Sequence, residues 1–156
     1  MSLRRRLGPL LLLVVAAALV AGFLLLRGGE DDPFDDYCSE VADRREDVGA
    51  ALSAGATTGL LRALPSFEAL ADRSPDDIRA DWRLVIARIT ELEEALAAAG
   101  VDPSTYRVEA PPAGLADDDR KAIEAAAVRL GSPETATALA RVEQQARDVC
   151  KTPLSL

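Results

Sequence analysis

Residues 74–100 read SPDDIRADWRLVIARITELEEALAAAG, and this stretch has the strongest regular pattern in the chain. Large apolar side chains recur every three or four positions between Ile78 and Leu96, which places them along one face of an α-helix. The serine, proline and two aspartates at its start are typical of a helix N-terminus, and the final glycine is typical of a C-terminus. The stretch therefore predicts a long helix that buries one face, with Trp82 in the protein core rather than in a ligand platform.

Four more helices are predicted around this one from the same spacing and from similar end signals. Three consecutive aspartates open one of them, and a Ser-Pro-Glu sequence opens the last. Pro65 lies inside another, where it predicts a kink or a break. No stretch alternates between apolar and polar residues as a half-buried strand does, so the sequence predicts an all-α fold with helices at residues 33–55, 57–71, 74–100, 117–131 and 132–150.

Residues 101–116 interrupt the helical pattern with three prolines and a glycine. Binding residues concentrate in long irregular segments, and tyrosine and arginine are both enriched at interaction hot spots. Tyr106 and Arg107 are therefore the candidate partner-binding residues, although a tyrosine in such a segment is more often packed. If they act only in binding, replacing both with alanine should weaken partner capture without lowering the melting temperature.

The two cysteines, Cys38 and Cys150, lie near the start and the end of the helical region. We expect them to form a disulfide bond, the alternative being two unpaired buried thiols. The bond would bring the start of the first helix to the end of the last, which in an antiparallel bundle requires an even number of passes. Five helices give an odd number. Either residues 101–116 run back along the 74–100 helix, or the 117–131 helix lies across the end of the bundle.

The N-terminal region has the composition of a membrane anchor. Residues 7–26 contain no charged side chain, follow three consecutive arginines and would measure about 30 Å as a helix, the thickness of the bilayer core. Basic residues before this segment and acidic residues after it favour a cytoplasmic N-terminus and an extracytoplasmic C-terminal domain at the plasma membrane. The alternative is a cleaved secretory signal, whose apolar segment is usually shorter. The predicted order is a cytoplasmic basic segment at 1–6, a transmembrane signal anchor at 7–26, an acidic linker at 27–36 and a helical bundle at 37–156.

Composition excludes several functions. The chain has no histidine, which removes catalytic triads, Cys-His catalysis and histidine-ligated metals or haem. Four of its 18 basic side chains lie at or before Arg27, and all 26 acidic ones follow it, which leaves a net charge of −12 that repels nucleic acid. The acidic clusters at 30–36 and 117–119 precede or open predicted helices, where the helix dipole favours carboxylates. The sequence therefore assigns no cofactor, metal or catalytic residue.

Sixteen arginines against two lysines, with abundant alanine and no asparagine, suggest a genome of high GC content. The chain also has a basic and apolar start, a Tyr37-Cys38 pair, a serine and a proline before Trp82, and Cys150 near its end. In these features it resembles small, uncharacterised membrane-anchored or secreted helical proteins of actinobacteria. The resemblance covers the whole chain in outline. It implies no known activity and transfers no catalytic residue.

These features predict a single-pass membrane protein with an antiparallel bundle of four to five helices, closed by a disulfide, that acts outside the cytoplasm. Its expected role is that of a non-enzymatic binding or scaffolding module. The membrane is reached through residues 7–26, and the expected partner is a protein rather than a nucleic acid. Two alternatives stay open: a secreted bundle released by signal cleavage and, much less favoured, a carboxylate-dependent enzyme acting on a cell-wall glycan.

Overall fold

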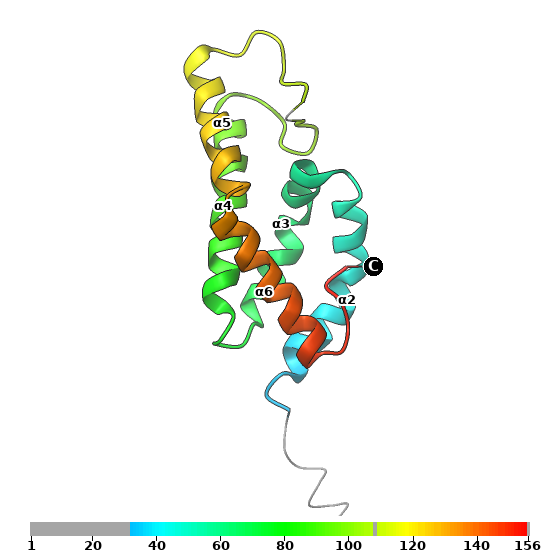
Figure 1. Cartoon of the computed structure of the whole chain (residues 1–156). Coiled ribbons are helices and arrows are strands. Elements are labelled where there is room, and N and C mark those ends of the chain that lie inside the picture. The colour runs from blue at the N-terminus through cyan, green and yellow to red at the C-terminus, as the bar shows by residue number, and fades with distance from the viewer. Residues whose placement is uncertain (1–31, 108, 156) are drawn as a thin grey trace, which may run out of the picture. The chain divides into compact units, whose positions relative to one another are not determined.

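The computed structural model describes residues 32–107 and 109–155, and this part of the chain contains five α-helices (Figure 1). None of these five has both the length and the apolar composition that a membrane span requires. The predicted segments 1–6 and 7–26 lie outside the described residues, and the predicted linker is described only from residue 32. The helices are α2 (Asp35–Leu52), α3 (Ala56–Asp72), α4 (Arg79–Ala98), α5 (Asp117–Leu130) and α6 (Pro133–Val149). The all-α prediction is confirmed for these residues, and each of the five helices overlaps its predicted range.

Helix α4 begins later than its sequence signal predicts, which corrects the expected start at residue 74. The Ser74 hydroxyl does not cap α4 but donates to the Ala71 carbonyl oxygen at 2.7 Å, at the end of α3. The Ser74 carbonyl oxygen in turn accepts a hydrogen bond from Arg79 Nη2 at 3.0 Å. Residues 75–78 form a turn that buries Ile78. Ser74 therefore closes the connection from α3, and the burial of Ile78 outweighs the local helix-start signal.

Helix α3 runs through Pro65 rather than splitting there. Pro65 is exposed, so its ring lies on the solvent side of α3 and not against a neighbouring helix. The opposite side of α3 is packed: Phe67 is fully buried, and its ring centroid lies 5.5 Å from that of Trp82. Trp82 itself has no exposed surface, which confirms its predicted core position. Tertiary packing thus maintains the helix despite the proline.

Helices α5 and α6 together form the fourth pass of the bundle. Polar side chains of α5 and α6 pair with residues of α4 and of the turn before it. The residue numbers rise along α5 and α6 while those of the partners fall, so the two helices run antiparallel to α4 as one pass. Pro133 separates the two helices because it has no amide hydrogen and favours an extended Ser132, whose ψ is 154°. The pairs are Arg129–Glu91 at 2.8 Å, Glu134–Arg88 at 3.9 Å, Arg141–Asp81 at 3.4 Å and Gln145–Asp77 at 3.0 Å.

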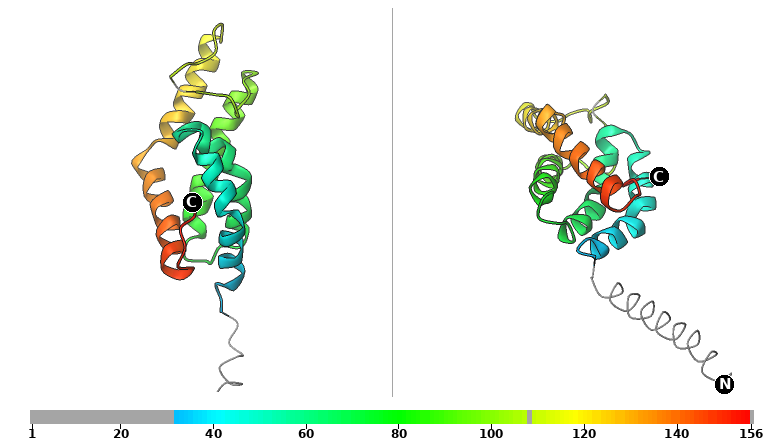
Figure 2. Two further views of the ribbon diagram at one scale, coloured as in Figure 1. Left: turned by 90° about the vertical axis from the view of Figure 1, so that its right-hand side faces the viewer. Right: turned by 60° about the horizontal axis from the view of Figure 1, so that its bottom comes forward.

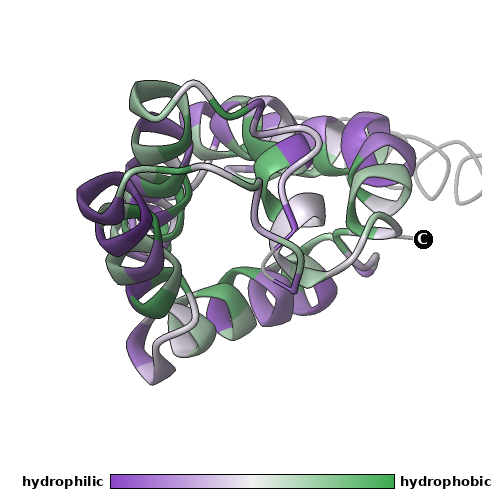
Figure 3. Cartoon of the chain, turned by 90° about the horizontal axis from the view of Figure 1, so that it is seen from above, coloured by the Kyte–Doolittle hydropathy of each residue, from purple (hydrophilic) through white to green (hydrophobic). Residues whose placement is uncertain are grey.

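The bundle therefore has four passes of alternating direction, as the two side views show (Figures 1 and 2). Viewed along their length, the helices surround a common centre (Figure 3). Both explanations offered for the odd helix count are wrong: residues 101–116 cross the end of the bundle instead of following α4, and α5 follows α4 instead of lying across that end. The even number of passes arises because α5 and α6 share one.

The other end of the bundle is closed by the predicted disulfide. The bond joins Cys38 to Cys150, with their Cα atoms 5.1 Å apart, so the pairing is confirmed and no free cysteine remains. The chain then turns at Lys151, whose φ is +56°. Arg45 Nη1 of α2 donates to Thr152 Oγ1 at 2.9 Å, and Leu154 is buried. The last residues are thereby packed back against the bundle.

Candidate functional site

The end of the bundle opposite the disulfide is covered by residues 101–116, here called the crossing segment (Figure 1). It leaves α4 through Gly100, whose φ of +69° glycine adopts without strain. Asp102 Oδ1 then accepts hydrogen bonds from the Ser104 hydroxyl at 2.8 Å and the Ser104 amide at 2.9 Å. These two bonds hold the pKa of the Asp102 carboxyl below its usual value. The start of the crossing segment is therefore a defined turn.

Two side chains of α3 fasten the crossing segment to the bundle. Arg62 donates to the Ser104 carbonyl oxygen from Nη2 at 2.8 Å and from Nε at 3.1 Å. Thr58, which is buried, donates from Oγ1 to the Tyr106 carbonyl oxygen at 2.5 Å. Both bonds hold main-chain atoms of the crossing segment in addition to the contacts that its side chains make.

A cleft of about 490 Å³, here called the tip cleft, lies between the crossing segment and α5. Its lining is mostly apolar and includes three polar side chains, those of Thr57, Arg120 and Glu124. Clefts of this size with apolar walls and few polar groups are typical of sites that receive an apolar or amphipathic group. The apolar lining consists of Tyr106, Pro111, Leu115, Ile123, Ala127 and Val128.

The structure places the two predicted binding residues in different hollows. Tyr106 is only 5% exposed, packs with the core and forms part of the tip-cleft wall. Burial raises its pKa, and the charges of Glu124 and Glu109 add to that effect. Arg107 is exposed and lines a separate hollow of about 100 Å³, together with Glu109. The two residues are therefore adjacent in sequence but line different hollows, which have Thr57 in common, and their role in binding stays a prediction.

Val128 is the cleft residue that sequence reasoning missed. It is 73% exposed, the one large hydrophobic side chain so exposed among the described residues. The periodicity of α5 places Ile123, Ala126 and Leu130 inward and leaves Val128 off that face. The available signal was an apolar residue on the outer side of a predicted helix. Single exposed valines are common, so this signal alone gave no reason to select Val128.

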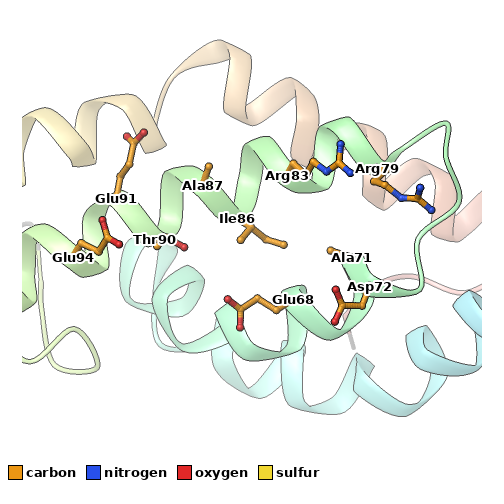
Figure 4. Close-up of a pocket in the computed structure, with 10 residues that line it drawn as sticks. All are labelled: Glu68, Ala71, Asp72, Arg79, Arg83, Ile86, Ala87, Thr90, Glu91 and Glu94. Carbon is orange, nitrogen blue, oxygen red and sulfur yellow. The ribbon is translucent and has the colours of Figure 1, made fainter.

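A second hollow, of about 680 Å³, lies between α3 and α4 and is here called the α3/α4 groove (Figure 4). Ile86, Ala87 and Thr90 of α4 lie along its middle. The remaining polar lining consists of six charged side chains, compared with two in the tip cleft. The charged side chains are Glu68 and Asp72 from α3 and Arg79, Arg83, Glu91 and Glu94 from α4.

Near the disulfide, Tyr37 and Trp82 form a buried polar pair. Both are almost completely inaccessible, and neither Tyr37 Oη nor Trp82 Nε1 has a hydrogen bond of normal geometry within the described part of the chain. Burial raises the pKa of Tyr37 to about 12. The indole N–H of Trp82 partly opposes this shift, and the charge of Asp77 adds to it. The pair belongs to the core, and neither residue lines the tip cleft.

The acidic clusters that are described have structural positions. Asp117, Asp118 and Asp119 occupy the first turn of α5, as predicted, and Asp117 pairs with Arg120 at 2.5 Å. Within residues 32–107 and 109–155, no three histidine, cysteine, aspartate or glutamate side chains converge as a metal site. The described geometry offers cavities for binding. Comparisons of the chain with protein-family models, curated proteins and solved structures gave no match.

Proposed function

We propose that the chain is a single-pass membrane protein, anchored by residues 7–26, whose helical bundle lies outside the cytoplasm and binds or scaffolds another protein. The bundle has no catalytic role in this proposal. The tip cleft is its binding surface, because it combines apolar walls with an exposed apolar edge at Val128.

The observation that carries the proposal is the Cys38–Cys150 disulfide. Disulfides persist in oxidising compartments outside the cytoplasm and are rare within it. The sequence of residues 1–26 supports the same location, since three arginines precede an uncharged apolar segment. The runner-up, a secreted bundle released by signal cleavage, shares the disulfide and differs in the fate of residues 7–26.

Protease treatment of intact cells tests the location. We expect added protease to digest the bundle in whole cells. In untreated cells, we expect the protein to be found in the membrane fraction with its full mass. A shortened protein recovered from the medium would support the secreted alternative. Protection of the bundle in intact cells, with both cysteines open to alkylation, would contradict both.

Crosslinking on whole cells tests the binding surface. Val128→Ser should reduce crosslinking to the partner without changing the melting temperature, since Val128 contributes little to the core. Ala125→Ser, on the exposed side of the same helix and outside the cleft lining, is the matched control and should have no effect. Equal partner capture by all three proteins would exclude the tip cleft.

The predicted residues need separate tests. Because Tyr106 is buried, its replacement by alanine should lower the melting temperature as well, so the expectation of unchanged stability does not hold for it. Arg107 is exposed and forms no ion pair among the described residues, so Arg107→Ala tests its role in binding with little effect on stability. Loss of capture in this variant would extend the binding surface beyond the tip cleft.

A further inference from the structure

The charge that the tip cleft leaves available is negative. Glu124 lines the cleft and is exposed, and it has no hydrogen bond or ion pair within residues 32–107 and 109–155. Arg120, the one basic side chain of the lining, is already paired with Asp117 at 2.5 Å. A group that enters the cleft therefore meets one uncompensated carboxylate.

The electrostatic surroundings of the cleft have the same sign. Burial raises the pKa of Tyr106 in the cleft wall, and the two charges that raise it further, those of Glu124 and Glu109, are both negative. The first turns of α5, residues 117–124, contain four carboxylates and two basic side chains. The whole chain has a formal net charge of −8. These charges attract a cationic partner and repel an anion or a second copy of the chain.

Helix α5 sets this carboxylate beside the apolar surface. The residues of α5 that line the cleft follow one another at helical spacings of three and four, so they form a single stripe. Glu124 and the exposed Val128 are one turn apart in it, about 6 Å along the helix. The stripe consists of Arg120, Ile123, Glu124, Ala127 and Val128. It fits a partner that presents an apolar group and a cation a similar distance apart.

The residues that precede the bundle are too few to fill the cleft themselves. The chain enters the bundle at the disulfide end, and the cleft lies at the opposite end, the length of α2 away, which is about 27 Å for 18 residues. Fully extended, residues 27–32 span at most about 22 Å. With residues 7–26 in the membrane, as proposed above, the occupant of the cleft has to be a separate molecule.

We propose that the tip cleft binds a protein segment that presents a large apolar side chain next to the side chain of a lysine or an arginine. The apolar side chain enters between the crossing segment and α5, and the cation lies against the Glu124 carboxylate. Val128 then covers the aliphatic stem of the basic side chain. This binding mode rests on the proposed role of the tip cleft as the binding surface and adds the chemistry of the partner.

Binding of short peptides tests this chemistry. The full-length protein, labelled at its N-terminus, is held in nanodiscs of phosphatidylcholine, which has no net charge. The probe is the peptide Gly-Leu-Ser-Lys-Gly, whose leucine and lysine lie on one side of an extended chain about 7 Å apart. Two control peptides replace the lysine with glutamate or the leucine with alanine. Microscale thermophoresis should show that the probe binds about tenfold more tightly than either control.

Charge changes at Glu124 identify the contact. Glu124→Gln should weaken binding of the lysine peptide about fivefold, and Glu124→Lys should make the glutamate peptide the tighter ligand. Glu68→Gln and Glu68→Lys are the matched controls, because they change the net charge equally. Glu68 is also exposed and without an ion pair in the described part of the chain, but it lies on α3 outside the tip cleft. Both control variants should keep the preference for lysine.

The Val128→Ser variant separates the chemistry of the partner from the position of the binding surface. Equal or tighter binding of the glutamate peptide, weakened by Val128→Ser, would overturn the cationic partner and leave the tip cleft as the binding surface. Binding of the lysine peptide that Glu124→Gln does not weaken, or that Glu68→Gln weakens equally, would also overturn it. Absence of binding by all three peptides would do the same, whereas the cleft itself is judged by partner capture on whole cells.

Discussion

The two ends of the bundle are closed by different means. At one end a covalent bond joins α2 to the residue after α6, and the fully buried Trp82 and Tyr37 lie close by in the first turns. At the other end an irregular segment is held to α3 through main-chain hydrogen bonds from Thr58 and Arg62. The end covered by the crossing segment contains an apolar cleft, which no residue next to the disulfide lines. A rigid base can thus support a recessed surface at the opposite end.

Removing the disulfide should have the largest effect on this contrast. Replacing Cys38 and Cys150 with serine opens a loop of 112 residues, and we expect the free energy of unfolding to fall by about 4–5 kcal/mol. Urea denaturation measures the change, and the reduced wild-type protein should match the variant. A loss below about 1 kcal/mol would show that noncovalent packing alone closes this end.

Alkaline pH should weaken the same end. The pKa of Tyr37 is about 12 in the folded protein and near 10 when unfolded, so the folded state holds this proton more tightly. The corresponding stabilisation is complete below pH 10 and is lost as the pH rises through 12, by about 2–3 kcal/mol. Tyr37→Phe should remove this part of the pH dependence. Tyr106→Phe, at the cleft end, should remove a smaller part of this pH dependence. A larger effect of Tyr106→Phe than of Tyr37→Phe would contradict the stronger burial of Tyr37 at the disulfide end.

A close helix contact should make the cleft end sensitive to one methyl group. A Cβ atom on Gly59 would lie 2.8 Å from Leu52 Cα and 3.0 Å from the Ala51 carbonyl oxygen, both main-chain atoms of α2. Gly59→Ala should therefore destabilise the protein by about 1–3 kcal/mol in thermal unfolding. Gly131→Ala is the control, because its nearest contact is 3.5 Å and its φ is −80°. It should leave stability unchanged or slightly higher.

The smallest expected effect concerns the attachment of the crossing segment. Thr58→Val removes the hydrogen bond to the Tyr106 carbonyl oxygen and should cost about 1–2 kcal/mol. Hydrogen exchange should accelerate in residues 101–107 more than in the first turns of α2. Thr137→Val, which removes an exposed bond within α6, should not change exchange at the cleft. Uniform acceleration along the chain would show that the two ends are not independent.

Most of the helix pattern could be predicted because its signals are local. The apolar period, Ser132 with Pro133, and the aspartates at 117–119 lie within the helices they define or directly before them. The start of α4 could not be predicted, since it depends on the burial of Ile78 and on a hydroxyl that turns back to α3. The number of passes was missed because a helix ended by proline was counted as a change of direction.

The site was harder to predict than the fold. Tyr106 lines the tip cleft, but it is a buried residue of the cleft wall and not an exposed contact residue. The exposed apolar edge of the cleft is Val128, which lies on α5. That combination depends on where the crossing segment meets α5, which no local pattern specifies. Gly59 gave no signal either, because a glycine inside a helix reads as a weak position rather than as a contact between two main chains.

The disulfide also determines how the domain responds to mechanical load. Cys38 lies in the first turn of the first described helix and Cys150 directly follows the last, so tension applied between residues 33 and 150 passes from one to the other through sulfur. The helices between them carry almost none of that tension. If this domain is pulled between those two points, only the few residues outside the bridge extend, and the bundle keeps its shape until the bond is reduced.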